Sequence, residues 1–455
     1  MAISGTGSSN TVRVAPGEST SYGSALAMVT TLFFMWGFLT SLNDILIPHL
    51  KSIFELNYAK VMLVQFAFFS TYAILGMPSG KVVEWIGYKR TMVVGLLTMG
   101  LGALLFIPAA KVPSFPLFLG ALIVLAAGIT ALQVAANPYV AVLGPPATAS
   151  SRLNLTQAFN SLGTVIGPWF GALVILRTAG KVVTNPNSLS PEALHAYRVH
   201  EASTVNIPYL GIALALILLG LAIAMYKFPR IETTKDFRPS VLHKHGEGIW
   251  SHPHVVFGAI GICVYVGAEV AIGSFLINYF ARPEIGGLAT AAGGSSLHAA
   301  SATLLLFLAK FLGSWVPLYW GGLMLGRFIG SALLQRIRAG KLLAVCAVCA
   351  TILVIVSMLT NGSIAVWSIL LVGLFNSIQF PSIFTLGIAE MGPLTGEASG
   401  LLITAIVGGA IIPELQGLLA DRIGIHHAFI LPILCYAFIT WYGLRGSRIV
   451  RPYAA

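Results

Sequence analysis

Acidic side chains inside apolar segments are the residues of this sequence best able to do chemistry. Asp44, Glu269 and Glu414 each interrupt a long apolar stretch. A charge in hydrocarbon costs at least about 2.5 kcal/mol, so such residues usually face water and serve a function. Burial disfavours the charged form of a carboxylate, which therefore takes up or releases a proton as its surroundings dry or flood. We expect Asp44 and Glu269 to bind a coupling ion, and Glu414 to be an outer gate at most.

Each of the two main acids also has a purely structural explanation. Asp44 lies near one end of its segment, where an acid can simply form hydrogen bonds at the membrane interface. Glu269 can form a buried ion pair with Arg327. The two acid-bearing segments correspond in the two halves of the chain, so we expect both carboxylates to face one central chamber.

Amide side chains form a second set within the apolar segments. An amide in a membrane helix needs a partner, which is either another helix or a ligand rich in hydroxyl groups. Sugars are bound by such amides and carboxylates together with aromatic rings, although a single ring is more often packing. The predicted substrate-binding residues are Asn43, Gln133, Asn137, Gln157, Asn160, Glu269, Asn278, Asn376, Gln379, Trp36 and Phe275. Gln157 and Asn160 are three residues apart and share one helix face.

A charged segment with two glycines lies between the second and third apolar stretches. It contains Gly80, Glu84, Gly87, Lys89 and Arg90. Glycines permit a tight turn and close helix approach, and an acid can interact with a helix amino terminus or with an arginine of another span. We therefore predict a conformational latch, to which we assign Arg152 as well. The alternative is an ordinary charged loop.

The composition indicates a membrane protein without a soluble enzyme domain. The 455 residues are 56% hydrophobic and only 9% charged, with a mean hydropathy of +0.86, whereas soluble domains are about a quarter charged. The net charge of +11 comes from residues at the ends of apolar runs. This placement follows the positive-inside rule and does not form a nucleic-acid stripe. We expect a lipid bilayer as the surroundings and no nucleic-acid partner.

Twelve apolar runs are long enough to span a membrane. They cover residues 24–50, 58–80, 91–110, 115–140, 153–176, 207–227, 254–281, 312–336, 341–361, 363–390, 397–420 and 427–445. The distribution of basic residues places both termini in the cytoplasm. The predicted fold is all-α, with twelve transmembrane helices in two pseudo-symmetric six-helix bundles.

The predicted domains follow from this count. Residues 1–23 form a disordered cytoplasmic tail, because they lack the basic start and apolar core of a cleavable signal. The bundles cover 24–227 and 251–447, a polar cytoplasmic linker covers 228–250, and a short tail covers 448–455. The segment 282–311 is interpreted as an outside loop with an interfacial helix, because another full span would invert everything after it.

Internal repetition supports two related halves. Asn137 and Pro138 match Phe380 and Pro381, at an offset of 243 residues. Gly144 matches Gly387, Pro168 matches Pro413, and Gly76 and Gly80 match Gly326 and Gly330 at similar offsets. A duplicated six-helix unit binds its substrate between the halves, which rock around it.

Cysteine and histidine spacing gives little indication of a metal site. Cys346 and Cys349 are spaced like a redox or metal pair, but no second pair accompanies them. His243 and His245 lie beside a lysine, as solvated loop histidines do. We expect no metal and no cofactor.

At these residues the sequence resembles the fucose, galactose and glucose proton symporters of the major facilitator superfamily, and in particular their glucose/galactose transporter branch. The resemblance covers nearly the whole chain after residue 24. It rests on Trp36-Gly37-Phe38, Asn43-Asp44, Ala135 to Tyr139, Leu143 to Pro145, Arg152 to Ser161, Tyr265 to Glu269, Gly322, Gly326-Arg327 and Ser377 to Phe384.

The resemblance implies that Asp44 is the carboxylate of proton coupling and that Gln157 and Asn160 are sugar ligands. The fucose symporter has a glutamate where this chain has Gln133, so that acid cannot titrate here and Glu269 takes over part of its role. This difference argues against fucose as the main substrate. Sodium remains an alternative ion, since some relatives are described as sodium-coupled.

The sequence therefore predicts a monomeric transporter of the bacterial inner membrane for proton-coupled uptake of a neutral hexose. Glucose or galactose is the first choice, and N-acetylglucosamine the next. A proton-driven drug exporter would need a greasy cavity with few amides, and an enzyme acting on lipid-linked sugars would need paired catalytic acids or a metal cluster. A sugar sensor would look identical in sequence, and only flux separates it.

Overall fold

Helices account for the secondary structure of the chain wherever it is described. The computed structural model describes residues 22–54, 58–112, 114–171, 206–228, 248–285 and 316–449, with a few scattered residues between 190 and 203. The side chains of residues 42–62 lie outside this description. So do the predicted tails, most of the linker 228–250 and nearly all of the segment 282–311.

In the described part of the first half, the chain forms five long helices. They are α1 (Tyr22–Phe54), α2 (Tyr58–Lys111), α3 (Phe115–Val142), α4 (Ala149–Gly171) and α6 (Asn206–Met225). Helix α2 contains two of the predicted spans, which meet at Gly87 with φ 80° and ψ 164°. A positive φ is readily adopted only by glycine, so Gly87 is where the chain reverses between these spans.

The second half supplies α7 (Pro253–Phe280), α9 (Val316–Leu333), α10 (Ala339–Leu359), α11 (Gly362–Asn376), α12 (Gln379–Gly387), α13 (Thr395–Thr404), α14 (Gly408–Ile423), α15 (Ile425–Ala428) and α16 (Ile430–Trp441). Two of the predicted spans are interrupted helices. The first is interrupted between α11 and α12, and the second between α13 and α14. Pro381 and Pro413 lie about one turn after these breaks. Because proline has no backbone N–H, each removes a helical hydrogen bond to the preceding turn, where the break lies.

Segment lengths agree with twelve membrane crossings. Among the described residues, nine segments are long and apolar enough to cross a membrane, and one of them, Leu63–Lys111, has 49 residues. A helix rises 1.5 Å per residue, so this segment is long enough to cross a core of about 30 Å twice. Helices α4 and α9 complete the twelve. Their apolar character is lower because α4 carries several buried polar residues and α9 carries a buried arginine.

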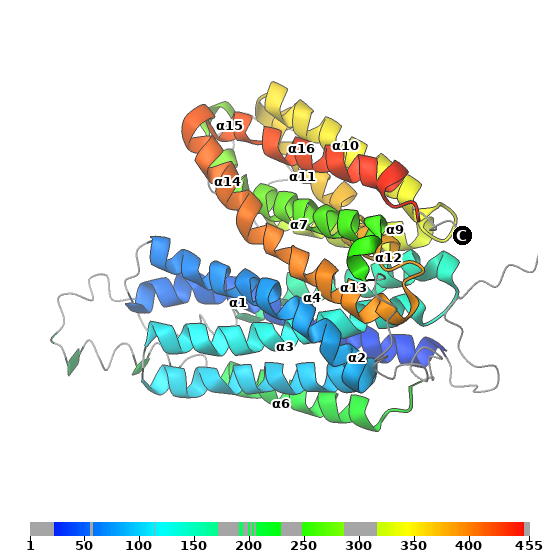
Figure 1. Cartoon of the computed structure of the whole chain (residues 1–455). Coiled ribbons are helices and arrows are strands. Elements are labelled where there is room, and N and C mark those ends of the chain that lie inside the picture. Colours follow the sequence, from blue (N-terminus) through cyan, green and yellow to red (C-terminus); the bar gives the residue numbers. More distant parts are fainter. Residues whose placement is uncertain are drawn as a thin grey trace, which may run out of the picture.

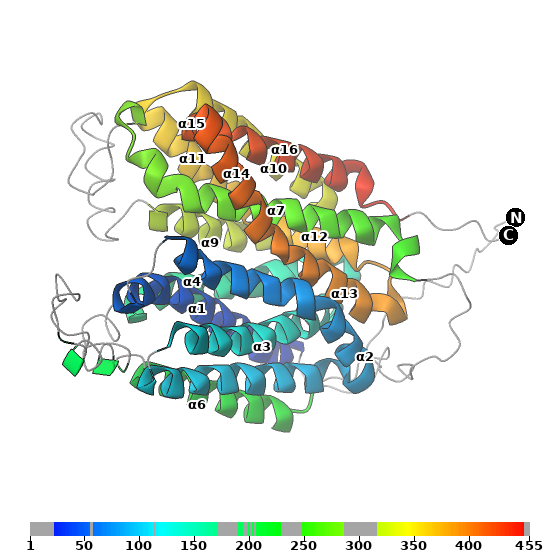
Figure 2. The ribbon, with the colours of Figure 1, turned by 60° about the vertical axis from the view of Figure 1, so that its left-hand side comes forward.

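The helices form two bundles that lie side by side (Figures 1 and 2). Helices α1, α2, α3, α4 and α6 make one bundle, and α7 with α9 to α16 makes the other. The core within each bundle is built from large buried side chains such as Phe33, Phe106 and Tyr279. Exposed aliphatic side chains cover much of the outer surface, including Leu218, Ile352 and Leu434. An apolar exterior of this kind suits contact with lipid.

Hydrogen bonds join the bundles at the end of the molecule where α4 and α13 begin. Ser151 Oγ of α4 donates to Ser331 O of α9 at 2.7 Å, and Ser331 Oγ donates back to Ser151 O at 3.1 Å. Ser399 Oγ of α13 donates to Val134 O of α3 at 2.8 Å. Ser150 of α4 and Thr385 of α12 also share a hydroxyl hydrogen bond, at 2.5 Å. Serines let helices approach closely and form hydrogen bonds between the bundles, so this end is closed. We call the contact surface between the two bundles the seam.

Candidate functional site: a polar seam between the two bundles

Glu269 is buried in the middle of α7 and held by a tyrosine one turn earlier. Tyr265 Oη donates to Glu269 Oε1 at 2.9 Å. Only 9% of Glu269 is exposed. Tyr319 of α9 donates more weakly to the backbone oxygen of Glu269, at 3.5 Å. A carboxylate in this setting is pre-organised to exchange a proton or to accept a hydrogen bond from a ligand.

Arg327 of α9 lies near Glu269 without pairing with it. Its charge acts on the Glu269 carboxylate, but no ion pair within 4.0 Å joins the two among the described residues. The guanidinium instead crosses the seam. Arg327 Nη1 donates to Gln157 O at 3.1 Å and to Ser161 Oγ, and Asn154 Nδ2 donates to Arg327 O at 2.7 Å. The structural alternative for Glu269, a buried ion pair, is therefore absent from this conformation.

Two amides of the second bundle, Asn376 and Gln379, form a chain beside this acid. Asn376 Nδ2 donates to Tyr319 Oη at 2.8 Å, and Gln379 Nε2 donates to Asn376 Oδ1 at 3.1 Å. Both residues are fully buried at the break between α11 and α12. Gln379 Oε1 has no partner among the described residues. The interrupted span thus brings three of the polar side chains together.

The first bundle holds a similar pair of amide contacts. Gln133 Nε2 donates to Tyr72 Oη at 2.7 Å, and Gln157 Nε2 lies 3.4 Å from Asn137 Oδ1. Gln133 Oε1 and Asn137 Nδ2 are buried without partners among the described residues. A buried acceptor and donor without partners are costly, so this pair is suited to binding water or a hydroxyl-bearing ligand.

Asn160, a candidate sugar-binding residue, also forms a contact between two helices. Asn160 Nδ2 donates to Phe33 O of α1 at 2.9 Å. At Gly37 a methyl group would come within 2.0 Å of Asn160 O, so only a glycine allows α1 and α4 to approach this closely. Asn43 and Asp44 belong to the same helix α1, but their side chains lie outside the described residues.

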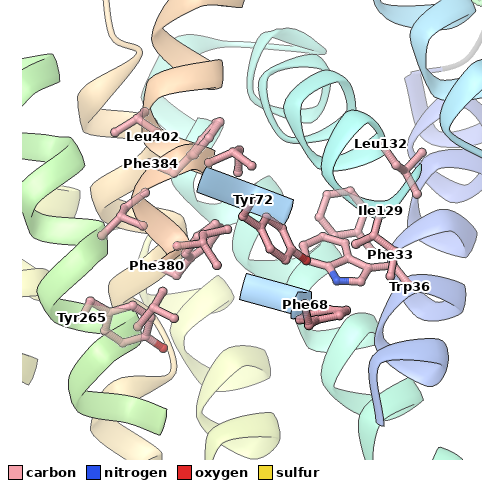
Figure 3. Packing of buried hydrophobic residues seen from close by; sticks show 14 of the residues in the cluster. Phe33, Trp36, Phe68, Tyr72, Ile129, Leu132, Tyr265, Phe380, Phe384 and Leu402 are labelled. Carbon is pink, nitrogen blue, oxygen red and sulfur yellow. The ribbon is translucent and has the colours of Figure 1, made fainter. Parts of the chain in front are cut away.

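Aromatic side chains from both bundles gather around the seam (Figure 3). Trp36 packs against Phe33 with ring centroids 5.3 Å apart, and Tyr72 lies beside them. Phe380 and Phe384 stack on each other in the opposite bundle. Phe275 instead packs toward Gly417 of α14, and Asn278 is exposed near the end of α7. The structure therefore groups Trp36 with the amides but leaves Phe275 and Asn278 away from the contacts described above.

The predicted latch residues fall into two groups. Glu84 lies against the start of α13, where a methyl group on Gly396 would stand 3.7 Å from Glu84 Oε1, and Gly80 packs on Gly396 O. Lys89 Nζ donates to Ala224 O at 2.8 Å, Arg90 is exposed and Gly87 forms the turn. The first group can hold two bundles together through a helix amino terminus.

Arg152 acts within its own bundle. Its guanidinium donates to Ala141 O at 2.6 Å and to Pro145 O at 3.0 Å, beyond the end of α3. A cation that satisfies the last carbonyl groups of a helix stabilises that helix end. Arg152 thus fixes the connection from α3 to α4 and makes no described contact with the second bundle.

Sequence reasoning left out Tyr72, Tyr319 and the seam contacts of Arg327. The sequence does indicate a role for Arg327, because an arginine inside an apolar segment is rare. Nothing in the sequence distinguishes the two tyrosines, since an apolar helix often contains tyrosine. Among the described residues, no group of three histidine, cysteine or acidic side chains is placed to hold a metal ion. Cys346 and Cys349 are both unpaired and partly buried in α10.

Comparison with known proteins agrees with this architecture. Residues 27–413 match the Major Facilitator Superfamily. The glucose/galactose transporter of Brucella abortus is 50% identical over 427 residues, which cover 94% of this chain and 95% of that protein. The L-fucose-proton symporter of Escherichia coli is 34% identical over 93% of both proteins.

Solved structures give the same answer. The crystal structure of the transporter FucP in the outward conformation has a TM-score of 0.82 and 33% identity, and covers 94% of this chain and 100% of that one. The human organic anion transporter MFSD10 shares the fold, with a TM-score of 0.58 and 13% identity. Twelve crossings in two bundles, a polar seam between them and a sequence match over most of the length place this chain in the Major Facilitator Superfamily, whose members are membrane transporters and not enzymes.

Proposed function

We propose that this protein takes up a neutral hexose, glucose or galactose, together with a cation by alternating access. The proposal carries the substrate of the glucose/galactose transporter of Brucella abortus over to this chain. A proton is the favoured ion, since the related protein of Escherichia coli is a fucose-proton symporter. Sodium is the alternative. The fucose of that relative and N-acetylglucosamine are the alternative sugars.

The arrangement around Arg327 is the observation that carries this proposal. Arg327 lies between the buried acid of one bundle and the amides of the other, bonding Gln157 O while its charge acts on Glu269. An acid, uncharged amides and aromatic rings on both sides of one seam suit a polyhydroxylated, uncharged ligand. An apolar drug would leave these amides without partners, which is costly.

The closed end supports a particular orientation. Counted from a cytoplasmic amino terminus, the segments 81–90 and 143–148, which follow the second and fourth predicted spans, lie in the cytoplasm. They and the beginning of α13 belong to the end where serines join the bundles. With this end in the cytoplasm, the protein is in an outward-facing state, the conformation in which FucP was crystallised. Both termini then face the cytoplasm, and we place the protein in the bacterial inner membrane.

The remaining assignments belong to the same proposal. The bundles cover residues 24–227 and 251–447, joined by the linker 228–250. The protein works as a monomer and needs no cofactor besides its coupling ion. Asp44 takes part in ion coupling with Glu269, and the sugar contacts the amides of both bundles.

Transport into proteoliposomes tests the proposal. Labelled glucose, galactose, fucose and N-acetylglucosamine are each offered under a proton gradient and under a sodium gradient. We expect proton-driven accumulation of glucose or galactose, and its loss in Asp44→Asn and in Glu269→Gln. Accumulation of none of the four sugars would contradict the sugar assignment. A strict requirement for sodium would replace the proton as coupling ion, and equal accumulation by all three proteins would remove both acids from the mechanism.

A further inference from the structure

Arg327 has partners that exist only while the seam is closed. Its Nη1 donates to Gln157 O and to Ser161 Oγ, both on α4 of the first bundle. Within its own bundle it makes one longer contact, from Nε to Ser377 O at 3.4 Å. When α4 and α9 separate, the guanidinium loses its two bonds to α4. A cation that loses two bonds takes water or a nearby anion in their place, and a charge-assisted bond to a carboxylate is the stronger replacement.

Glu269 is the replacement that the structure offers. Among the described residues, Arg327 is the cation whose charge acts on this carboxylate, and the hydroxyls of Tyr265, Tyr319 and Tyr436 also face Glu269. Glu269 Oε1 accepts from Tyr265. Among the described residues, neither Glu269 Oε2 nor Arg327 Nη2 makes a hydrogen bond, so an acceptor and a donor are both available.

We propose that Arg327 changes partner during transport, bonding α4 while the seam is closed and pairing with Glu269 once the seam opens. This inference rests on the proposed function, in which Glu269 carries the proton. An adjacent guanidinium favours the charged carboxylate. The proton carried by Glu269 therefore leaves its oxygen for water on the side that has just opened. Arg327 is thus a positioning residue that links proton release to the opening of the seam.

The serines of the seam provide a reporter of closure. Ser151 Oγ and Ser331 Oγ lie 3.4 Å apart on the two bundles. In a background without Cys263, Cys346, Cys349 and Cys435, the pair Ser151→Cys and Ser331→Cys can form a disulfide only when the seam is closed. The rate of disulfide formation in sugar-free proteoliposomes therefore measures the closed population.

The expected results follow from the change of partner. Glu269→Gln cannot accept the guanidinium as a charge, so disulfide formation becomes at least about threefold faster. In an Arg327→Gln background, Glu269→Gln is expected to leave the disulfide rate unchanged. In an Arg327→Lys background, which keeps the positive charge, Glu269→Gln should still raise the rate, but by a smaller factor. Asp421→Asn, at an exposed acid of α14, is the matched control and leaves the rate unchanged.

Two results would overturn the inference: a rate that does not respond to Glu269→Gln, or an equal response without Arg327. A second measurement compares sugar exchange with proton-driven accumulation. Arg327→Gln should lower accumulation at least about tenfold more than it lowers exchange. Equal loss of both activities would give Arg327 a structural role only. Absence of sugar uptake by the unmodified protein would contradict the proposed function. The disulfide rates would still decide whether Arg327 changes partner, because they are measured without sugar.

Discussion

Gly76 of α2 and Gly400 of α13 lie backbone to backbone across the seam. A methyl group on Gly76 would come within 2.9 Å of Gly400 O, and a methyl group on Gly400 would come within 2.9 Å of Gly76 O. Small residues allow membrane helices to approach closely and to gain packing energy that larger residues prevent. The reciprocal contact belongs to the closed conformation, because it joins helices of different bundles.

Substituting either glycine by leucine should therefore favour opening at this end. Gly76→Leu and Gly400→Leu are expected to slow uptake by more than about tenfold, since overpacking typically costs 1–3 kcal/mol. The measurement is sugar uptake together with labelling of a cysteine placed at the closed end, which should become faster. Gly211, where a methyl group would meet nothing within 4 Å, is the matched control. Unchanged labelling in both variants would show that the contact does not stabilise the closed state.

Glu84 should stabilise the same contact electrostatically. Its side chain lies over Gly396 in the first turn of α13. A carboxylate near a helix amino terminus contributes typically 0.3–1 kcal/mol. Glu84→Gln is therefore expected to shift the closed population about two- to fivefold toward opening, with the disulfide rate of the Ser151 and Ser331 cysteine pair as the measurement. Glu84→Asp, which keeps the charge on a shorter side chain, should have a smaller effect. A larger shift in Glu84→Asp than in Glu84→Gln would contradict the electrostatic explanation.

Tyr265 should matter for coupling through its hydroxyl group. Tyr265→Phe keeps the ring and removes the hydrogen bond to Glu269 Oε1. A hydrogen bond to a charged group contributes about 1.5–3 kcal/mol, so proton-driven accumulation should fall about tenfold or more. Tyr139→Phe, in α3 of the first bundle, is the matched control. Its hydroxyl is buried and makes no hydrogen bond among the described residues. Equal effects of the two substitutions would show that Tyr265 contributes only packing.

Much of the fold follows from local properties of the sequence. The predicted span 115–140 corresponds to α3 at Phe115–Val142, and 254–281 corresponds to α7 at Pro253–Phe280. Membrane helices are recognisable because each must satisfy its own backbone and present apolar side chains to lipid. The turn at Gly87 was equally accessible, because a glycine between two apolar runs is the residue that a reversal requires.

The contacts of the site could not be predicted in the same way. Arg327 and Gln157 are 170 residues apart, and nothing in either segment specifies that they meet. The assignment of Arg152 to the latch shows the same limit. The sequence shows a basic residue at the start of a span, but whether it bonds the preceding helix or another bundle depends on tertiary packing. Asn160 also has a partner, Phe33 O, that its spacing from Gln157 does not reveal.

Asn160 provides a test that separates structural support from sugar binding. Its Nδ2 donates to Phe33 O, while its Oδ1 makes no hydrogen bond among the described residues and is available to a ligand hydroxyl. Asn160→Asp removes the donor and keeps the acceptor geometry, whereas Asn160→Ala removes both. Hydrogen bonds between membrane helices contribute about 0.6 kcal/mol on average, so Asn160→Ala should lose only a small amount of thermal stability in detergent. Asn160→Asp should lose more, because it also buries an ionisable group.

Sugar affinity should then separate the two variants. If Oδ1 accepts a sugar hydroxyl, Asn160→Ala weakens binding about tenfold, as loss of one hydrogen bond in a buried site does. Asn160→Asp should keep more of the affinity because its oxygen can still accept. Binding measured by isothermal titration, alongside the melting temperatures, distinguishes the roles. Equal affinity in the unmodified protein and in Asn160→Ala, with a lowered melting temperature, would make Asn160 a bond between α1 and α4 and remove it from the sugar site.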